Sequence, residues 1–257
     1  MVGAFFVGKL ERIANFVAMK RLAICIIALA LCIAASAQPK EITVKAGDIV
    51  IELVRIEPGS VTVGDDTYTV ESPFYVSKLP VAWGDWFDAC GTGALTKPQG
   101  KVRQNPVPMD FTSRDKWTGK MKPDENHKKY VEAYANWIVA QGGQKLDVPT
   151  LAEWMVACGP VPPFEEIEKQ AWIDGARHNV GLKEPNANGV YDMLGLVAEM
   201  VEVPGDGYWY IGGLPLISAK KQVSKEPTIL YSIHKQPYDN AWNPTFRLVL
   251  REEPANQ

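Results

Sequence analysis

The chain has 257 residues and carries 27 Lys and Arg against 30 Asp and Glu, a formal net charge of −3. Because 46% of its residues are hydrophobic, it contains ample apolar material for a folded core. A mildly acidic chain without a basic cluster argues against nucleic acids and anionic membranes as partners.

The first 37 residues have the pattern of a secretory signal peptide. A basic pair at positions 20 and 21 precedes the apolar run LAICIIALALCIAA, and ASA supplies a small-x-small cleavage site. The 16 residues from Leu22 to Ala37 are fewer than the roughly 20 that span a bilayer, so we expect cleavage after Ala37 rather than an anchor. Met19 directly precedes the basic pair, which makes residues 1–18 a candidate upstream mis-start.

Cleavage at this site predicts a secreted or periplasmic protein with no membrane span in its mature form. The remaining 220 residues, 38–257, suit a single domain. The removed segment has four basic residues and one acidic residue, a net of +3, so the mature chain has a net charge of −6.

Two cysteines, Cys90 and Cys158, remain after cleavage. An even pair in an oxidising compartment is compatible with a disulfide. The alternative is two buried free thiols, since cysteine is among the most buried residue types. Both cysteines end apolar segments and precede glycine, which favours buried helix ends over a bridge.

The N-terminal half of the mature chain predicts short strands followed by a helix. Val and Ile recur at period two over residues 41–76, with Pro-Gly and Gly-Asp turn signals between the runs. Residues 83–90, WGDWFDAC, predict a short helix that Gly91 can end. Residues 91–125 are rich in proline and glycine and predict irregular coil.

Two further helices follow the coil. Asn126 is the expected N-cap of an amphipathic helix, whose apolar residues recur at helical spacing: Tyr130, Ala133, Tyr134, Trp137 and Ile138. In the second helix, LAEWMVAC, Thr150 and Glu153 have the spacing of a capping box, which gives Glu153 a structural role.

The C-terminal part is expected to be mostly irregular over residues 171–215 and to close on the apolar strand FRLVL. These elements together predict an α+β domain with short antiparallel strands, two main helices and much ordered coil.

Six motifs in chain order resemble those of the formylglycine-generating enzyme, or sulfatase-modifying factor, family. They are LVRIEPGSVTVG, LPVAWGDWFDAC, YVEAYANWIVAQGG, LDVPTLAEWMVACG, PNANGVYDMLGLVAEM and PTFRLVL. The family typically reads RLPTEAEWEYA, then PN..GLYDM.GNVWEW, then RGGSW, and ends in GFR. The resemblance covers roughly residues 50–250 and implies a variant of the C-type lectin fold.

The resemblance also implies a structural Ca²⁺ site in residues 188–200. Members of the family bind Ca²⁺ there through an Asp or Asn side chain, two carbonyl groups and a Glu side chain. By position these ligands are Asp192, the carbonyls of Gly195 and Val197, and Glu199. Ca²⁺ prefers such oxygens, and glycine permits the tight turn. The alternative is that Glu199 is a buried carboxylate satisfied by backbone N–H groups.

The departures from the family pattern bear on catalysis. Catalytic members hold copper with two cysteines near the C-terminus, whereas this chain has no cysteine after Cys158. Copper(I) needs soft thiolate ligands, so no copper is expected. RGGSW is reduced to IGGLP and NVWEW to LVAEM, and the three histidines (127, 178 and 234) are isolated in sequence. We therefore expect no catalytic residues and, at most, a pseudoenzyme.

Three functions follow from this reading. The first is an exported, non-catalytic binding or structural domain with a protein or glycan partner at the bacterial cell envelope. The second is a divergent formylglycine-generating oxidase that acts on a sulfatase cysteine. The third is a lectin-like receptor that displays a ligand-binding surface, for which YSIHKQPYDNAWNP has a paratope-like composition.

Overall fold

The computed structural model describes residues 38–91, 99–106, 123–174, 176, 178–212, 231, 233–234 and 244–252. The expected signal segment, most of the 91–125 coil and most of the paratope-like stretch lie outside these residues. The unit described below begins at Glu41. Among the described residues, no helix is both long and apolar enough to cross a membrane.

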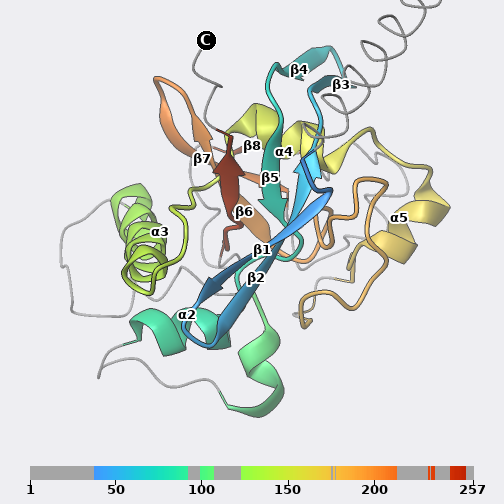
Figure 1. The fold of residues 1–257 in the computed structure, drawn as a ribbon. Coiled ribbons are helices and arrows are strands. Elements are labelled where there is room, and N and C mark those ends of the chain that lie inside the picture. Colours follow the sequence, from blue (N-terminus) through green and yellow to red (C-terminus); the bar gives the residue numbers. More distant parts are fainter. Residues whose placement is uncertain are drawn as a thin grey trace, which may run out of the picture. The chain divides into compact units, whose positions relative to one another are not determined.

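The expected N-terminal strands form an antiparallel sheet with the C-terminal strand. Its strands are β1 (Glu41–Ala46), β2 (Ile49–Ile56), β5 (Phe74–Ser77) and β9 (Val249–Arg251), paired in the order β1-β2-β5-β9. Figure 1 shows β5 and β9 side by side, although more than 170 residues separate them in sequence. The hairpin of β3 (Gly59–Val63) and β4 (Asp66–Val70) forms a separate two-stranded sheet.

A second sheet takes two of its strands from the stretch 171–215, which was expected to be mostly irregular. It consists of β6 (Ala198–Val203), β7 (Gly207–Gly212) and β8 (Ile233–His234) in that order, all antiparallel. The expectation of a mostly irregular stretch holds for the described residues of 171–197, but the β6–β7 hairpin was not identified because its glycines and proline are also typical of coil. Pro204 and Gly205 belong to its tight turn, and Gly205 has a φ of +82°.

The described part of the chain contains four α-helices, where one short helix and two main helices were expected. They are α2 (Trp83–Cys90), α3 (Pro123–Ala140), α4 (Leu151–Cys158) and α5 (Phe164–Gln170), with a 3₁₀ turn η1 (Gly100–Gln104). The predicted bounds of α2 and α4 are confirmed. Helix α3 begins three residues before Asn126, so Asn126 is not its N-cap. Helix α5 was missed because the prolines before it were interpreted as a break, whereas Pro163 is its N-cap residue.

Strand β5 and the C-terminal half of β2 are buried on both faces, because their alternate residues enter different core clusters. One face of β1 is exposed at Glu41, Thr43 and Lys45. On β2, Val54 and Ile56 join the first cluster, whereas Leu53 joins the second. The first cluster is completed by residues of α4 and α5: Trp154, Met155, Ala157, Cys158 and Ile167. The second is completed by residues of α2, α3 and the chain before β9: Trp86, Val131, Tyr134, Ile138, Phe246 and Leu248. This confirms the α+β class with short antiparallel strands.

Candidate functional site

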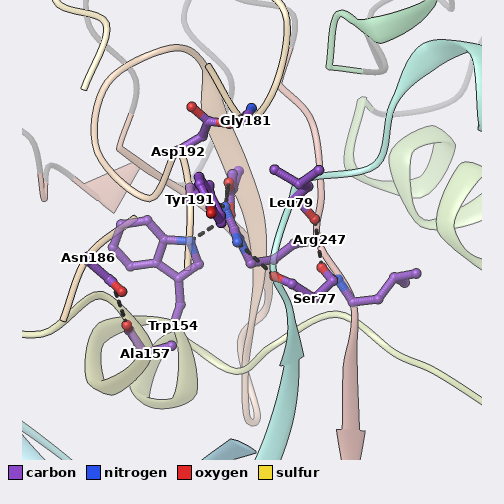
Figure 2. Close-up of polar contacts among 11 residues, drawn as sticks. Ser77, Leu79, Trp154, Ala157, Gly181, Asn186, Tyr191, Asp192 and Arg247 are labelled. Carbon is purple, nitrogen blue, oxygen red and sulfur yellow. Dashed lines mark hydrogen bonds and ion pairs between the residues drawn. The ribbon is translucent and has the colours of Figure 1, made fainter. Parts of the chain in front are cut away.

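The buried carboxylate of Glu199 on β6 is the centre of a charged network. Its Oε1 accepts from Arg247 Nη2 at 2.6 Å, and its Oε2 accepts from Arg247 Nε at 2.6 Å and from Trp154 Nε1 at 2.7 Å (Figure 2). Glu199 is 2% exposed and Arg247 is fully buried. Buried charges of this kind are stable only when they are paired and hydrogen-bonded, and here three donors serve one carboxylate.

Arg247 ties this network to two other parts of the chain. Its Nη1 donates to the carbonyl of Ser77 at the end of β5, and its Nη2 donates to the carbonyl of Tyr191, both at 3.1 Å. Strand alternation explains its direction: Phe246 and Leu248 enter the second core cluster, so Arg247 points to the opposite side. An arginine flanked by apolar residues in FRLVL is the sequence signal that could have identified it as part of the site.

The N-terminus of α4 has the predicted capping box. The Glu153 N–H donates to Thr150 Oγ1 at 3.2 Å, and the Thr150 N–H donates to Glu153 Oε2 at 2.7 Å. Arg251 adds a bidentate ion pair to the same carboxylate, with Nε and Nη2 each 2.8 Å from an oxygen. The structural role predicted for Glu153 is confirmed by these contacts.

The motif PNANG holds the other end of α4. Asn186 Nδ2 donates to the carbonyls of Ala157 and Cys158, and Asn188 Nδ2 donates to those of Val156 and Ala157, at 2.9–3.2 Å. The last carbonyls of a helix lack partners within the helix, so these amides replace water there. The loop that carries Asp192 is thereby attached to α4.

Besides Gly189, three residues of this loop have left-handed backbone conformations. The φ angles are +56° at Asp192, +70° at Gly195 and +53° at Leu196. A Cβ at position 195 would lie 2.2 Å from the carbonyl oxygen of Trp172, so only glycine fits. The Leu196 N–H donates to that same carbonyl at 3.0 Å. Such conformations persist only where the surroundings enforce them, and they concentrate at functional sites.

Asp192 is buried but only half satisfied. Its Oδ2 accepts from the Gly181 N–H at 2.6 Å, whereas its Oδ1 has no hydrogen-bond partner among the described residues. The side chain is 3% exposed. Burial raises the pKa of Asp192, and Glu199 raises it further, while the hydrogen bond from Gly181 and the charge of Arg247 lower it. A buried carboxylate oxygen without a donor is a point where a cation could bind.

The segment that faces this loop is fixed by a stack of side chains. The rings of Trp172 and His178 lie parallel with centroids 3.6 Å apart, and Lys183 Nζ lies 4.3 Å from the centroid of the Trp172 ring. His178 Nε2 also lies 2.8 Å from Asp174 Oδ2. These contacts give His178 a packing role, and they place the Trp172 carbonyl against Gly195.

The residues proposed as Ca²⁺ ligands fit the ion unequally. Asp192 offers a buried oxygen without a hydrogen-bond partner among the described residues, and when Asp192 is ionised the formal charges of Asp192, Glu199 and Arg247 sum to −1. Glu199 is already engaged by three donors, although a carboxylate has further lone pairs. Gly195 and Val197 lie between these two residues, in the turn that leads into β6. Among the described residues, no three His, Cys, Asp or Glu side chains converge on one point, but the expected set contains only two carboxylates.

Cys90 and Cys158 are free thiols in the structure. Cys158 at the end of α4 belongs to the first core cluster, whereas Cys90 at the end of α2 packs against the second. The two cysteines therefore do not form a disulfide in the structure, which matches the alternative of two free thiols. Burial raises the pKa of each thiol to about 12.

The fold is similar to that of several solved structures. PvdO from Pseudomonas aeruginosa matches 84% of this chain and 100% of its own, with a TM-score of 0.57 and 22% identity. Treponema denticola variable protein 1 matches 84% of this chain and 100% of its own, with a TM-score of 0.55 and 15% identity. CarF matches 79% of this chain and 99% of its own, with a TM-score of 0.50 and 17% identity.

PvdO and CarF have formylglycine-generating-enzyme-like folds, and this chain resembles them in fold. At these identities the likeness concerns the fold alone. No protein-family profile and no curated protein sequence matches the chain.

Proposed function

We propose that the chain is an exported, non-catalytic binding or structural domain on a formylglycine-generating-enzyme-like scaffold, a variant of the C-type lectin fold. The observation that carries the proposal is that residues 159–257 contain no cysteine, whereas catalytic members of the family it resembles hold copper there with a cysteine pair. A fold provides an activity only through its site, and this chain lacks the soft ligands of that site.

The two remaining cysteines support a non-catalytic role. A thiolate is the reactive and metal-binding form of cysteine, and a pKa of about 12 keeps both Cys90 and Cys158 protonated at neutral pH. They also belong to different core clusters, so they do not form a pair that could replace the missing one.

An oxidase assay tests the proposal directly. The chain is incubated with copper and a Cys-x-Pro-x-Arg peptide beside an active formylglycine-generating enzyme, and the peptide aldehyde is sought by mass spectrometry. We expect aldehyde only with the active enzyme. Formation of aldehyde by this chain would overturn the proposal in favour of a divergent oxidase.

Export is part of the same proposal. The basic pair, the apolar run and the ASA site support cleavage after Ala37. N-terminal sequencing of the protein recovered from the periplasm or medium is expected to begin at Gln38. A cytoplasmic protein that retains residues 20–37 would contradict it.

We further propose that Ca²⁺ has a structural role in the loop before β6. The support is the bare Oδ1 of Asp192, the net negative charge around it and the left-handed turn at Gly195. A ligand that binds only the folded state raises the melting temperature, so a Ca²⁺ titration followed by thermal melting tests the proposal. Equal melting temperatures in Ca²⁺ and in EDTA would contradict the proposed Ca²⁺ site.

A second candidate is a lectin-like receptor that displays a ligand-binding surface. It is favoured by the match to all of Treponema denticola variable protein 1 and by the Tyr, Asn, Asp and Trp content of residues 231–244. A near-copy of the corresponding gene segment beside the gene would support this candidate, and its absence would argue against it.

A further inference from the structure

A cavity of about 210 Å³ opens where the start of β2, the segment after β5 and the helices α2 and α3 meet. Its wall is mainly apolar and is lined by Val50, Ile51, Leu79, Val81, Tyr134 and Leu248. Figure 1 shows α2 beside the end of the β1–β2 hairpin that contributes to this wall. Pockets that enclose drug-sized ligands are larger, about 300–1,000 Å³, so this cavity fits a single side chain.

Two large apolar side chains of the wall are unusually accessible to solvent. Val50 is 56% exposed and Leu79 is 37% exposed, and both lie at the cavity. Exposed apolar side chains that gather around a cavity are typical of interaction sites, whereas single scattered ones are not. The apolar stem of an incoming side chain would cover them.

The charged residues at the cavity give it an acidic character. Glu52 and Asp85 line it together with Lys78. The Lys78 ammonium is 2.6 Å from Glu41 and 3.9 Å from Glu52, so its charge is already balanced. Counting Glu41, the group has three negative charges and one positive charge.

Asp85 is the carboxylate of this group that has no partner among the described residues. The nearest basic residue with an electrostatic effect on it is Arg103, whose two Nη atoms are held by Asp88. Partial enclosure raises the pKa of the Asp85 carboxyl, and Arg103 opposes that rise. The apolar wall and an unpaired carboxylate therefore meet at one cavity.

We propose that this cavity docks a basic side chain carried by a protein partner, with the apolar stem against the wall and the cationic end at Asp85 and Glu52. Lysine and arginine have this shape, since their methylene stems cover apolar surface while their charged ends stay near water. The proposal rests on the proposed binding function and names the chemistry that its partner would present.

The test is a chemical-shift titration of the full chain with the peptide Ac-Gly-Lys-Gly-NH₂. The matched probe replaces lysine by norleucine, which keeps the stem and removes the ammonium group. We expect chemical-shift changes at the backbone amides that line the cavity, with a dissociation constant of about 1 mM for the lysine peptide. The norleucine peptide should bind about five-fold more weakly.

Two substitutions locate the charge that is recognised. Asp85→Asn is expected to weaken the lysine peptide about five-fold, because it removes one partly exposed ion pair. Glu165→Gln makes the same charge change on the exposed start of α5 and is expected to leave binding unchanged. Should Asp85→Asn lose the dispersed spectrum of a folded chain, Glu52→Gln gives the same comparison at another carboxylate that lines the cavity.

Equal binding of the two peptides, or unchanged binding by Asp85→Asn, would overturn the proposal, as would shifts that lie away from the cavity. The aldehyde assay is independent of this titration. If the chain forms no aldehyde and does not bind the lysine peptide, only the docking proposal is wrong. If the chain forms aldehyde, the proposed function itself is wrong.

Discussion

Two buried carboxylates seven positions apart, Glu199 and Asp192, have opposite environments. Both oxygens of Glu199 are engaged by Arg247 and Trp154, whereas one oxygen of Asp192 has no partner among the described residues. Burial without a partner is costly, and burial with a full set of donors is not. The difference indicates that Glu199 holds the fold together, and it supports Asp192 as the residue to which a cation would be added.

The largest expected loss of stability comes from removing the charged partner of Glu199. Arg247→Met leaves Glu199 buried and unpaired, so the free energy of unfolding should fall by about 3–5 kcal/mol. Lys169→Met, which removes a surface ion pair with Glu166, should leave the free energy of unfolding almost unchanged. Urea denaturation measures both.

A double variant distinguishes the cost of leaving a charge unpaired from the cost of lost packing. Replacing Arg247 and Glu199 together with apolar residues should recover much of the loss, because no unpaired charge remains. If the single variant Arg247→Met were as stable as the wild type, the structural role of the pair would be wrong.

Ca²⁺ should stabilise the folded chain by binding to Asp192, the carboxylate with an oxygen that lacks a hydrogen-bond partner among the described residues. At a Ca²⁺ concentration about 100 times the dissociation constant, wild-type stability should rise by about 2.7 kcal/mol. Asp192→Ala should abolish most of this gain, because it removes the side-chain oxygen that would bind the ion. Thermal melting in Ca²⁺ and in EDTA provides the measurement, and an undiminished gain in the variant would place the ion elsewhere.

The turn between the two carboxylates can be probed with a matched pair of glycines. Gly195 and Gly205 both have positive φ, but a Cβ at position 205 meets nothing within 4 Å, whereas one at 195 meets the Trp172 carbonyl. Gly205→Ala should therefore cost only the left-handed conformation, about 1–2 kcal/mol, and Gly195→Ala should cost clearly more. Equal losses by denaturation would show that the close approach to Trp172 is unimportant.

The smallest expected effect is the pH dependence of Asp192 in metal-free buffer. Burial raises the folded-state pKa of Asp192 above its usual 3.8. The folded state then binds this proton more tightly than the unfolded state, so the stability it contributes is present at low pH and is lost as pH rises through the folded pKa. The stability of the wild type relative to Asp192→Asn should fall as pH rises from about 4. A difference that is constant with pH would contradict the raised pKa.

Local signals in the sequence predicted part of this fold well. The bounds of α2 and α4 and the capping box of Thr150 and Glu153 depend on residues within one turn of each other, so they can be predicted without the tertiary structure. Helix α5 and the β6–β7 hairpin were missed because proline and glycine mark turns as well as breaks, and only pairing across the hairpin distinguishes the two.

The candidate site was predicted in composition but not in arrangement. The sequence identified Asp192 and Glu199 as a pair, yet their different environments depend on partners far along the chain: Trp154 lies 45 residues and Arg247 lies 48 residues from Glu199. Neither spacing nor composition reveals such partners. Backbone N–H donors were the expected alternative for Glu199, whereas side chains satisfy it.

The position of Arg247 has a consequence for the order in which the chain can fold. Arg247 and Ser77 are 170 residues apart, and at synthesis rates of about 5–20 residues per second that separation takes roughly 10–30 s to make. During that time β5 has no β9 partner and Glu199, once made, has no counter-charge. The buried network around Glu199 therefore cannot form until Arg247 has been made, however early β5 and the helices form.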